Sequence, residues 1–293
     1  MRQDDGRESE NIEDRRSMGV GRGFGRRGFP GGGLGIAAAA VIALMMGVDP
    51  RIIFTAVGYL SNNSAPTVQS NGSVQSSPQD EKTKKFMSVV LADTEDTWGQ
   101  IFQQSGSHYE QPKLVLFTGQ VESACGYAQA AMGPFYCPGD HKLYLDMSFF
   151  NDLSTRFKAP GDFAQAYVLA HEVGHHVQNL LGIADQVQAA QQRGGRGQGN
   201  QLQVRMELQA DCFAGVWANR ANQFRKILEP GDLEEAMAAA SGVGDDRIQR
   251  QSQGYVVPES FTHGSSEQRM RWFNIGAKTG DLNQCDTFKA SSL

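Results

Sequence analysis

Two histidines four positions apart, with a glutamate directly after the first, form the strongest chemical pattern in the chain. His171, Glu172 and His175 make up an H-E-x-x-H motif. Residues four apart share one face of a helix, so both imidazoles can bind one tetrahedral metal ion. Zinc suits imidazole nitrogen and lowers the pKa of its bound water to about 7. Glu172 lies about 100° further round the helix, where it can take a proton from that water. The motif therefore predicts a zinc site with Glu172 as the catalytic base.

A catalytic zinc ion needs a third protein ligand and an open position. No histidine follows His175 at the sixth position. Glu207 and Asp211 are also four residues apart, in the next long helical pattern. We expect Glu207 to be the third ligand and Asp211 to accept the second N–H of His171. Asp185 is an alternative ligand, and a solvated pair of acids is the alternative interpretation of Glu207 and Asp211.

Two further segments could take part in the reaction. His263 lies in an F-T-H-G segment, where it could donate to a developing oxyanion, so we group it with the catalytic residues. The alternative is a histidine that caps a turn. The segment 142–146, KLYLD, could be a sheet edge that binds an extended peptide by strand addition, or a core strand. His176 has no place in this set.

The elements that hold these residues follow from hydrophobic spacing. Strands are predicted over 113–119 and 142–146, and helices over 82–104, 162–182, 201–227, 230–241 and 265–280, with a loop over 194–200. Ser265 and Gln268 have the spacing of a capping box. Gly174 costs about 1 kcal/mol inside a helix, which indicates that another backbone approaches it closely. The pattern predicts an α+β domain over 82–291 that is mostly helical, with a small sheet.

The four cysteines suit two disulfides in a chain with an export-type segment. Cys125 and Cys137 lie in one short segment that contains Gly and Pro, so we expect them to close a local loop. That pairing leaves Cys212 with Cys285. Four free buried thiols are the alternative.

The N-terminal part of the chain has three predicted segments. Residues 1–33 are rich in Arg and Gly and are predicted to be disordered. Residues 34–60 are predicted to be a transmembrane anchor and its flank, because 34–48 carry no charge. Residues 61–81 are predicted to be a polar linker. A buried helix and a cleaved signal peptide are the alternatives to the anchor.

Charge gives the anchor a direction and excludes one class of partner. The region 15–33 contains five arginines and no acid, which favours a cytoplasmic N-terminus. We therefore expect a single-pass membrane protein whose catalytic domain is periplasmic or extracellular. The net charge of −5 argues against nucleic acid as a partner, because phosphate binding needs a basic surface.

The motif helix followed by E-x-x-x-D on the next helix resembles the gluzincin metallopeptidases. Further segments resemble the YpfJ-like family of bacterial neutral zinc metallopeptidases, among them ESACGYAQAAMGPFYCPGD, HEVGHHVQNLLGI, ELQADCFAGVWA and FTHGSSEQRMRWF. The resemblance covers nearly the whole chain, except 61–80 and the last few residues. It implies a zincin-like peptidase domain, a Zn²⁺ cofactor and a membrane-anchored location.

The function expected from these patterns is a zinc-dependent endopeptidase that acts on peptide or protein substrates. Glu172 would assist the attack of a zinc-bound water and pass a proton to the leaving amine. One alternative is a zinc hydrolase of non-peptide amides or esters in the cell envelope. The other is a non-catalytic, membrane-tethered binding module.

Overall fold

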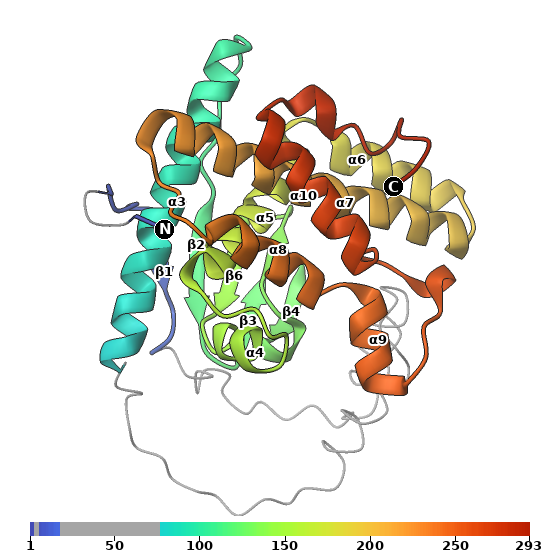
Figure 1. Cartoon of the computed structure of the whole chain (residues 1–293), viewed down its shortest axis with the longest axis horizontal. Coiled ribbons are helices and arrows are strands. Elements are labelled where there is room, and N and C mark those ends of the chain that lie inside the picture. Colours follow the sequence, from blue (N-terminus) through green and yellow to red (C-terminus); the bar gives the residue numbers. More distant parts are fainter. Residues whose placement is uncertain (3–5, 18–76) are drawn as a thin grey trace, which may run out of the picture. The chain divides into compact units, whose positions relative to one another are not determined.

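The computed structural model describes residues 1–2, 6–17 and 77–293 of the chain. These residues form a mostly helical α+β fold with a small sheet, as predicted, and they belong to one compact unit (Figure 1). The predicted anchor at 34–60 and most of the predicted linker lie outside the described residues. Among the described helices, none is both long enough and apolar enough to cross a membrane.

The main sheet has four strands in the order β1-β2-β6-β5. β1 (Ile12–Asp14), β2 (Lys113–Phe117) and β6 (Lys142–Asp146) are parallel, and β5 (Phe135–Cys137) runs antiparallel to β6. β3 (Gln120–Ser123) and β4 (Gly126–Gln129) form a separate antiparallel hairpin. The buried strand residues are mainly Leu, Val, Phe and Tyr, which suit a covered sheet.

Eleven helical segments complete the described fold. The long ones are α3 (Pro78–Gln104), α5 (Asp162–Leu180) and α7 (Arg196–Arg225). The shorter ones are α4 (Phe149–Thr155), α6 (Ile183–Arg193), α8 (Asp232–Gly242), α9 (Asp245–Gln253), α10 (Ser266–Thr279) and the 3₁₀ turns η1 (Ala130–Met132), η2 (Pro258–Ser260) and η3 (Leu282–Cys285).

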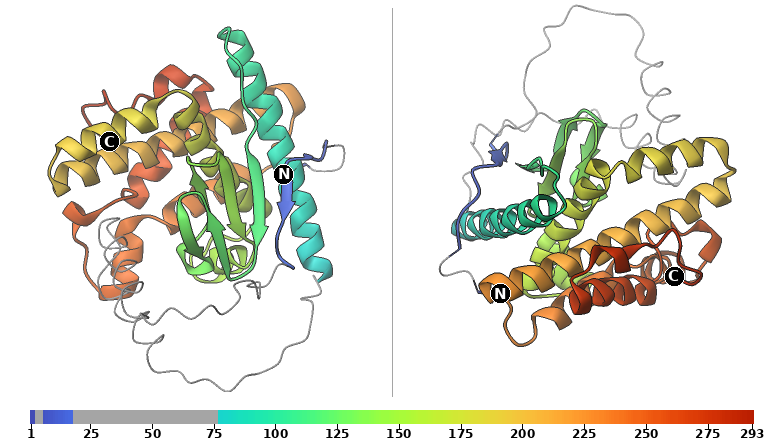
Figure 2. Two further views of the ribbon diagram at one scale, coloured as in Figure 1. Left: turned by 180° about the vertical axis from the view of Figure 1, so that it is seen from behind. Right: turned by 90° about the horizontal axis from the view of Figure 1, so that it is seen from above.

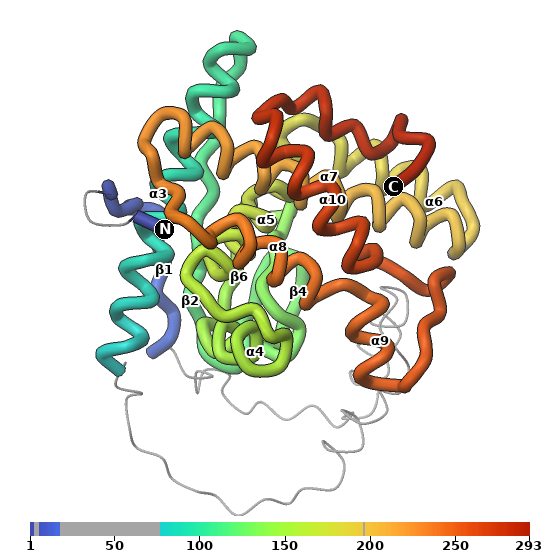
Figure 3. Tube along the Cα trace, viewed as in Figure 1, coloured from blue at the N-terminus to red at the C-terminus, as the bar shows by residue number. Residues whose placement is uncertain are grey.

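Local signals explain where several helices begin and end. Ser77 starts α3 with a capping box, and Ser265 starts α10 with the predicted one to Gln268. Gly182 follows α5 and Gly280 follows α10, both in the left-handed conformation that favours glycine. The stop at Gly182 turns the chain between α5 and α6, and α6 lies beside α7 (Figure 3).

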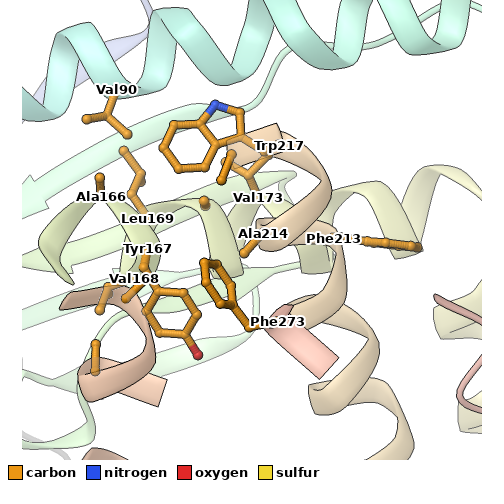
Figure 4. Packing of buried hydrophobic residues seen from close by; sticks show 14 of the residues in the cluster. Val90, Ala166, Tyr167, Val168, Leu169, Val173, Phe213, Ala214, Trp217 and Phe273 are labelled. Atoms are coloured by element: carbon orange, nitrogen blue, oxygen red, sulfur yellow. The ribbon is translucent and has the colours of Figure 1, made fainter. Parts of the chain in front are cut away.

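The core joins α3, α5, α7 and α10 through buried aromatic rings (Figure 4). Phe163 of α5 stacks on Trp217 of α7 with 5.7 Å between ring centroids. Phe273 of α10 meets Tyr167 of α5 edge-on at 5.4 Å. Aromatic pairs of this kind add about 0.5–1.5 kcal/mol each to the burial of their surface. The ligand-bearing helices are therefore fixed by the largest side chains of the core.

Glycines let these helices approach closely. A Cβ on Gly174 of α5 would lie 3.0 Å from the carbonyl O of Ala210 on α7, so the predicted close approach is confirmed. α10 lies along α7 in each view of the ribbon (Figures 1 and 2), and at Gly215 and Gly276 a Cβ would collide with backbone of the facing helix. Backbone contact at these positions leaves room for no other residue type without a shift.

Several predicted elements differ from the structure. Disorder over 1–33 is wrong for residues 6–17, because β1 pairs with β2 in the main sheet. The strand 142–146 is not a sheet edge, because β6 has β2 on one side and β5 on the other. The predicted loop 194–200 largely belongs to α7, and α3 begins at Pro78 rather than at residue 82. Both predicted disulfides are present, Cys125–Cys137 and Cys212–Cys285.

Candidate metal centre

Three side chains from α5 and α7 converge on one point. His171 Nε2 lies 3.2 Å from Glu207 Oε2, and His175 Nε2 lies 3.5 Å from the same oxygen. His171 and Glu207 are buried, and His175 is partly buried. Among the described residues, one donor atom from each of the three can be chosen so that all lie within 4.8 Å of one another. The alternative ligand Asp185 is on α6 and is not part of this group.

The spacing of the three donors fits a zinc ion. Ligand atoms at about 2.0–2.1 Å in tetrahedral geometry lie about 3.3–3.4 Å from one another. The two measured separations from Glu207 fall on either side of that value. Two imidazole nitrogens and one carboxylate also leave the fourth position free, as in catalytic zinc sites. These donors therefore suit a catalytic zinc ion rather than a closed structural one.

A buried network orients His171 from behind. Its Nδ1 lies 2.8 Å from Asp211 Oδ1, which directs Nε2 toward Glu207. Asp211 is fully buried and also accepts two hydrogen bonds from Arg269 of α10, at 2.8 and 2.9 Å. The Tyr167 hydroxyl contacts the same carboxylate. Asp211 thus occupies the position that the spacing of the two acids predicts, with a buried arginine as its counter-charge.

A second set of partners orients His175 and Glu207. Gln178 Oε1 accepts from Nδ1 of His175 at 2.9 Å, which leaves Nε2 toward Glu207. The Gln178 amide is itself fixed, because its Nε2 donates to the Met206 carbonyl O at 2.8 Å. Gln203 donates to Glu207 Oε1 at 3.0 Å. Each of the three grouped donors therefore has a hydrogen-bonded neighbour that sets its orientation.

The acidic groups make this point attractive to positive charge. Burial lowers the pKa of His171, but the carboxylates of Asp211 and Glu207 together outweigh burial and bring that pKa to about 9. Burial also opposes the charged form of His175, and Glu207 still raises its pKa. The facing imidazoles in turn hold the pKa of Glu207 well below its ordinary value, against the effect of burial. A cation at the convergence point would take the place of these protons.

The three donors open into a cleft of about 600 Å³. Glu172 lines this cleft and is partly exposed. Within the described part of the chain, its carboxylate forms no hydrogen bond or ion pair. The remaining walls are largely apolar and come from several elements: Met132, Pro134, Phe135, Phe149, Phe157, Val168, Met206, Val243 and Ile248. The cleft therefore combines a polar floor with apolar walls.

His263 lies on the rim of the same cleft, and a carboxylate holds it. Asp245 Oδ1 lies 3.2 Å from His263 Nδ1, and Asp245 Oδ2 accepts from the backbone N–H groups of 262, 263 and 264. The carboxylate rather than the histidine therefore caps this turn. Burial lowers the pKa of His263, but the hydrogen bond to Asp245 and the charges of Glu207 and Asp245 together raise that pKa overall.

The free edge of the sheet also borders the cleft. Among the described strands, β5 pairs with β6 alone, and its residues Phe135 and Tyr136 line the cleft. The edge strand that could bind an extended peptide is therefore β5, not the segment 142–146. Sequence reasoning missed β5 because it is three residues long and follows a Gly-Pro pair.

The comparison with protein families decides the assignment. The profile of the family described as "Putative neutral zinc metallopeptidase" matches residues 1–288. The chain belongs to this family. Membership confirms the family resemblance seen in the sequence, and the family's cofactor is Zn²⁺, which the donor set fits.

Relatives of similar length support the family assignment. "Uncharacterized protein YpfJ" of Escherichia coli (strain K12) is 50% identical over 295 residues, with 99% of this chain and 100% of that protein covered. A Mycobacterium tuberculosis protein (strain H37Rv) is 42% identical over 264 residues, with 86% of each chain covered. No solved structure matches the chain.

Three residues of the centre escaped the sequence patterns. Gln178 was not recognised from the sequence, although it lies three positions after His175, because glutamine is not a residue type that indicates a metal site. Arg269 and Asp245 lie far along the chain from the residues they contact. A weak signal existed for Arg269, since a charged residue stands on the buried side of α10. A buried charge needs a partner, and its partner is Asp211.

Proposed function

We propose that this protein is a zinc endopeptidase in which His171, His175 and Glu207 hold the metal and Glu172 is the general base. The supporting observation is the convergence of two imidazoles and one carboxylate beside a glutamate in one cleft. The family assignment supports a zinc peptidase at the general level. The roles of the individual residues are our proposal.

The chemistry divides between the ion and the protein. Zinc, when bound, polarises the scissile carbonyl and makes a water molecule acidic enough to be activated near neutral pH. Glu172 takes one proton as the water oxygen forms its bond to the carbonyl carbon. It then delivers that proton to the departing amine nitrogen as the C–N bond breaks. His263, held by Asp245, donates a hydrogen bond to the oxygen that gains negative charge.

The walls of the cleft support a peptide substrate. β5 is an edge strand among the strands that the structure describes, and the backbone groups on its outer side can bind an extended chain by strand addition. Its neighbours in the cleft are mainly apolar, so a large apolar side chain close to the scissile bond would be favoured. A peptide library distinguishes this activity from hydrolysis of non-peptide amides or esters.

Glu172→Gln tests the proposal directly. The variant keeps the shape of the side chain but cannot accept a proton, so we expect full zinc content and a fall in kcat of roughly 10²–10⁴-fold. Zinc is measured by atomic absorption and cleavage with a fluorogenic peptide library. Glu234→Gln, on α8, is the control that should change neither. Undiminished turnover by Glu172→Gln would remove Glu172 from the mechanism.

A further inference from the structure

A second polar cluster lies directly behind the candidate metal ligands on α5. His176 is fully buried, and its Nε2 lies 2.7 Å from the carbonyl O of Glu110. Its Nδ1 lies 3.1 Å from the Tyr136 hydroxyl. Asn179 donates to the same hydroxyl at 3.1 Å. The H-E-x-x-H motif gives no role to His176, yet the residue is as buried as any in the centre.

Tyr136 connects two parts of the candidate site. It belongs to β5, the sheet edge that borders the cleft. Its hydroxyl is bound by two residues of α5, which stand one and four positions after His175. One hydroxyl group and its two partners therefore link the edge strand directly to the ligand helix.

We propose that Tyr136 is a positioning residue. The contacts of its hydroxyl with His176 and Asn179 hold β5 at a fixed distance from α5, the helix that carries Glu172. This inference rests on the proposed function, because it assumes that β5 binds the peptide. A peptide on β5 would meet Glu172 at a distance fixed by this contact. Misplacement by about 1 Å can cost on the order of 10²-fold in rate, so a loose strand would weaken productive binding.

Tyr136→Phe removes only the hydroxyl and leaves the ring in place. We expect unchanged zinc content, faster amide exchange in β5, and KM for long peptides raised about tenfold with kcat less affected. Dipeptide-sized substrates that do not reach β5 should be cleaved as by wild type. Tyr144→Phe is the matched control, because the Tyr144 hydroxyl on β6 contacts Asp140 and does not line the cleft.

The outcomes separate this inference from the proposed function. An active Tyr136→Phe protein with wild-type KM for long peptides, or with wild-type exchange in β5, overturns the positioning role alone. Zinc-loaded wild type that cleaves no member of the peptide library overturns the proposed function, and the positioning role with it.

A second inference rests on independent contacts of residues 6–17, which belong to the same folded body as the metal centre. β1 continues the parallel sheet, with Ile12 opposite Leu114. Lys142 of β6 forms an ion pair with Glu13 at 2.8 Å. The N-terminal segment is thus a strand of the main sheet.

A buried carboxylate shows that this packing is integral to the fold. Glu95 of α3 is 2% exposed and accepts hydrogen bonds from Ser9 at 2.6 Å, Asn11 at 2.8 Å and Arg7 at 2.8 Å. Without the N-terminal segment, this charge would lose three hydrogen-bond partners. The segment and the helix that follows residue 77 therefore depend on each other.

The two chain ends that flank residues 18–76 are neighbours. Arg16 forms an ion pair with Glu81 at 2.8 Å, and Asp14 forms one with Lys84 at 2.9 Å. From these contacts we infer that residues 6–17 and the domain from 77 onward lie on the same side of any membrane that the chain meets. The arrangement expected from the sequence has a cytoplasmic N-terminus and the domain outside. That arrangement would place β1 and β2 on opposite sides of the membrane, although they are paired in the sheet.

Accessibility labelling of the full chain in cells tests this inference. Glu10→Cys and Lys278→Cys place single exposed cysteines on the N-terminal segment and on α10. The native cysteines are paired and should not react with a maleimide. A membrane-impermeant maleimide should therefore label both variants in intact cells, or label both only after the cells are permeabilised. Labelling of one variant but not the other in intact cells would overturn the inference. Carbodiimide treatment of the unmutated protein should also join Asp14 to Lys84, and absence of that cross-link would overturn it as well.

Discussion

At the scale of single residues, Asp211 is the most connected side chain of the metal centre. It is fully buried and meets an imidazole, a guanidinium and a phenol from three directions. Its negative charge steadies the orientation of His171, and Arg269 offsets the cost of burying that charge. The carboxylate therefore serves metal binding and folding together, and a substitution there affects both.

Asp211→Asn should separate those two contributions by magnitude. We expect zinc affinity to fall about 10- to 100-fold, because His171 loses the carboxylate that orients it. We also expect unfolding to become easier by about 3–5 kcal/mol, because Arg269 keeps a buried charge without its partner. Zinc titration and urea denaturation give the two values. Asp93→Asn, which breaks the pair with Arg225 outside the cleft, should lower stability only; an equal loss of zinc affinity there would contradict this account.

The pH dependence of activity should report on His263. Burial and the hydrogen bond to Asp245 oppose each other, and the pKa of His263 is raised overall. If the protonated imidazole assists the reaction, activity falls as pH rises through this pKa. Asp245→Asn removes the charge that favours protonation, so the alkaline limb of kcat/KM should move to lower pH. The same change in a His263→Gln background should shift nothing, and an equal shift there would assign the limb to another group.

Spacing alone predicted the residues that act within one helix. The i, i+4 pairs on α5 and α7 share helix faces, so their convergence needed only two adjacent helices. Arg269 and Gln178 could not be found in this way. Arg269 reaches Asp211 only through the packing of α10, and Gln178 shares α5 with His175 but is of a residue type that gives no metal-site signal.

At the scale of elements, the crossing of α5 and α7 controls the geometry of the centre. Gly174 lies between the two histidines of one helix, and Ala210 lies between the two acids of the other. The close approach at this point brings Nε2 atoms and a carboxylate within tetrahedral distance. A wider crossing would separate the donors without changing any of them.

Gly174→Ala should widen that crossing. The new Cβ would lie 3.0 Å from the Ala210 carbonyl O and 3.1 Å from its Cα. Overpacking costs about 1–3 kcal/mol, and better helix propensity returns roughly 1 kcal/mol, so we expect a net loss of up to about 2 kcal/mol. Zinc affinity should fall as well. Gly199→Ala at an open position of α7 should stabilise slightly, and a similar zinc defect there would refute the role of the crossing.

Long helices were predictable from sequence and short strands were not. The apolar stripes of α3, α5 and α7 span several turns, so the helical period of the apolar residues could be recognised in the sequence. β1 has three residues, Ile-Glu-Asp, and its partner lies 102 positions further on by the register of Ile12 with Leu114. Only the assembled sheet reveals such a strand, because its pairing is non-local.

At the scale of the whole molecule, the two disulfides span very different sequence separations. Cys125 and Cys137 close a loop of 12 residues beside the cleft, whereas Cys212 and Cys285 join positions 73 apart. The longer link connects α7, next to Asp211, with the segment that follows α10. It therefore fixes the helix that carries Arg269 to the helix that carries Glu207.

Removing each disulfide should give distinct results. By loop closure, the Cys212–Cys285 link contributes about 4 kcal/mol to the free energy of unfolding and the Cys125–Cys137 link about 3 kcal/mol. Replacing Cys212 and Cys285 by Ala should also weaken zinc binding, because Asp211 and Arg269 are then less firmly held. Replacing Cys125 and Cys137 should leave zinc affinity unchanged. Denaturant midpoints and zinc titrations decide, and equal zinc defects in both variants would contradict the assignment.

The parallel pairing of β1 with β2 has a consequence for how the chain is made. A ribosome completes β1 about a hundred residues before its partner strand β2 exists, because the register pairs Ile12 with Leu114. Until then β1 lacks its partner, and the edge of β2 then stays open until β1 pairs with it. Non-local parallel pairing slows folding and prolongs the exposure of unpaired edges. Nascent chains of this protein should therefore depend on chaperones during synthesis. The native state should form only once β1 has paired with β2.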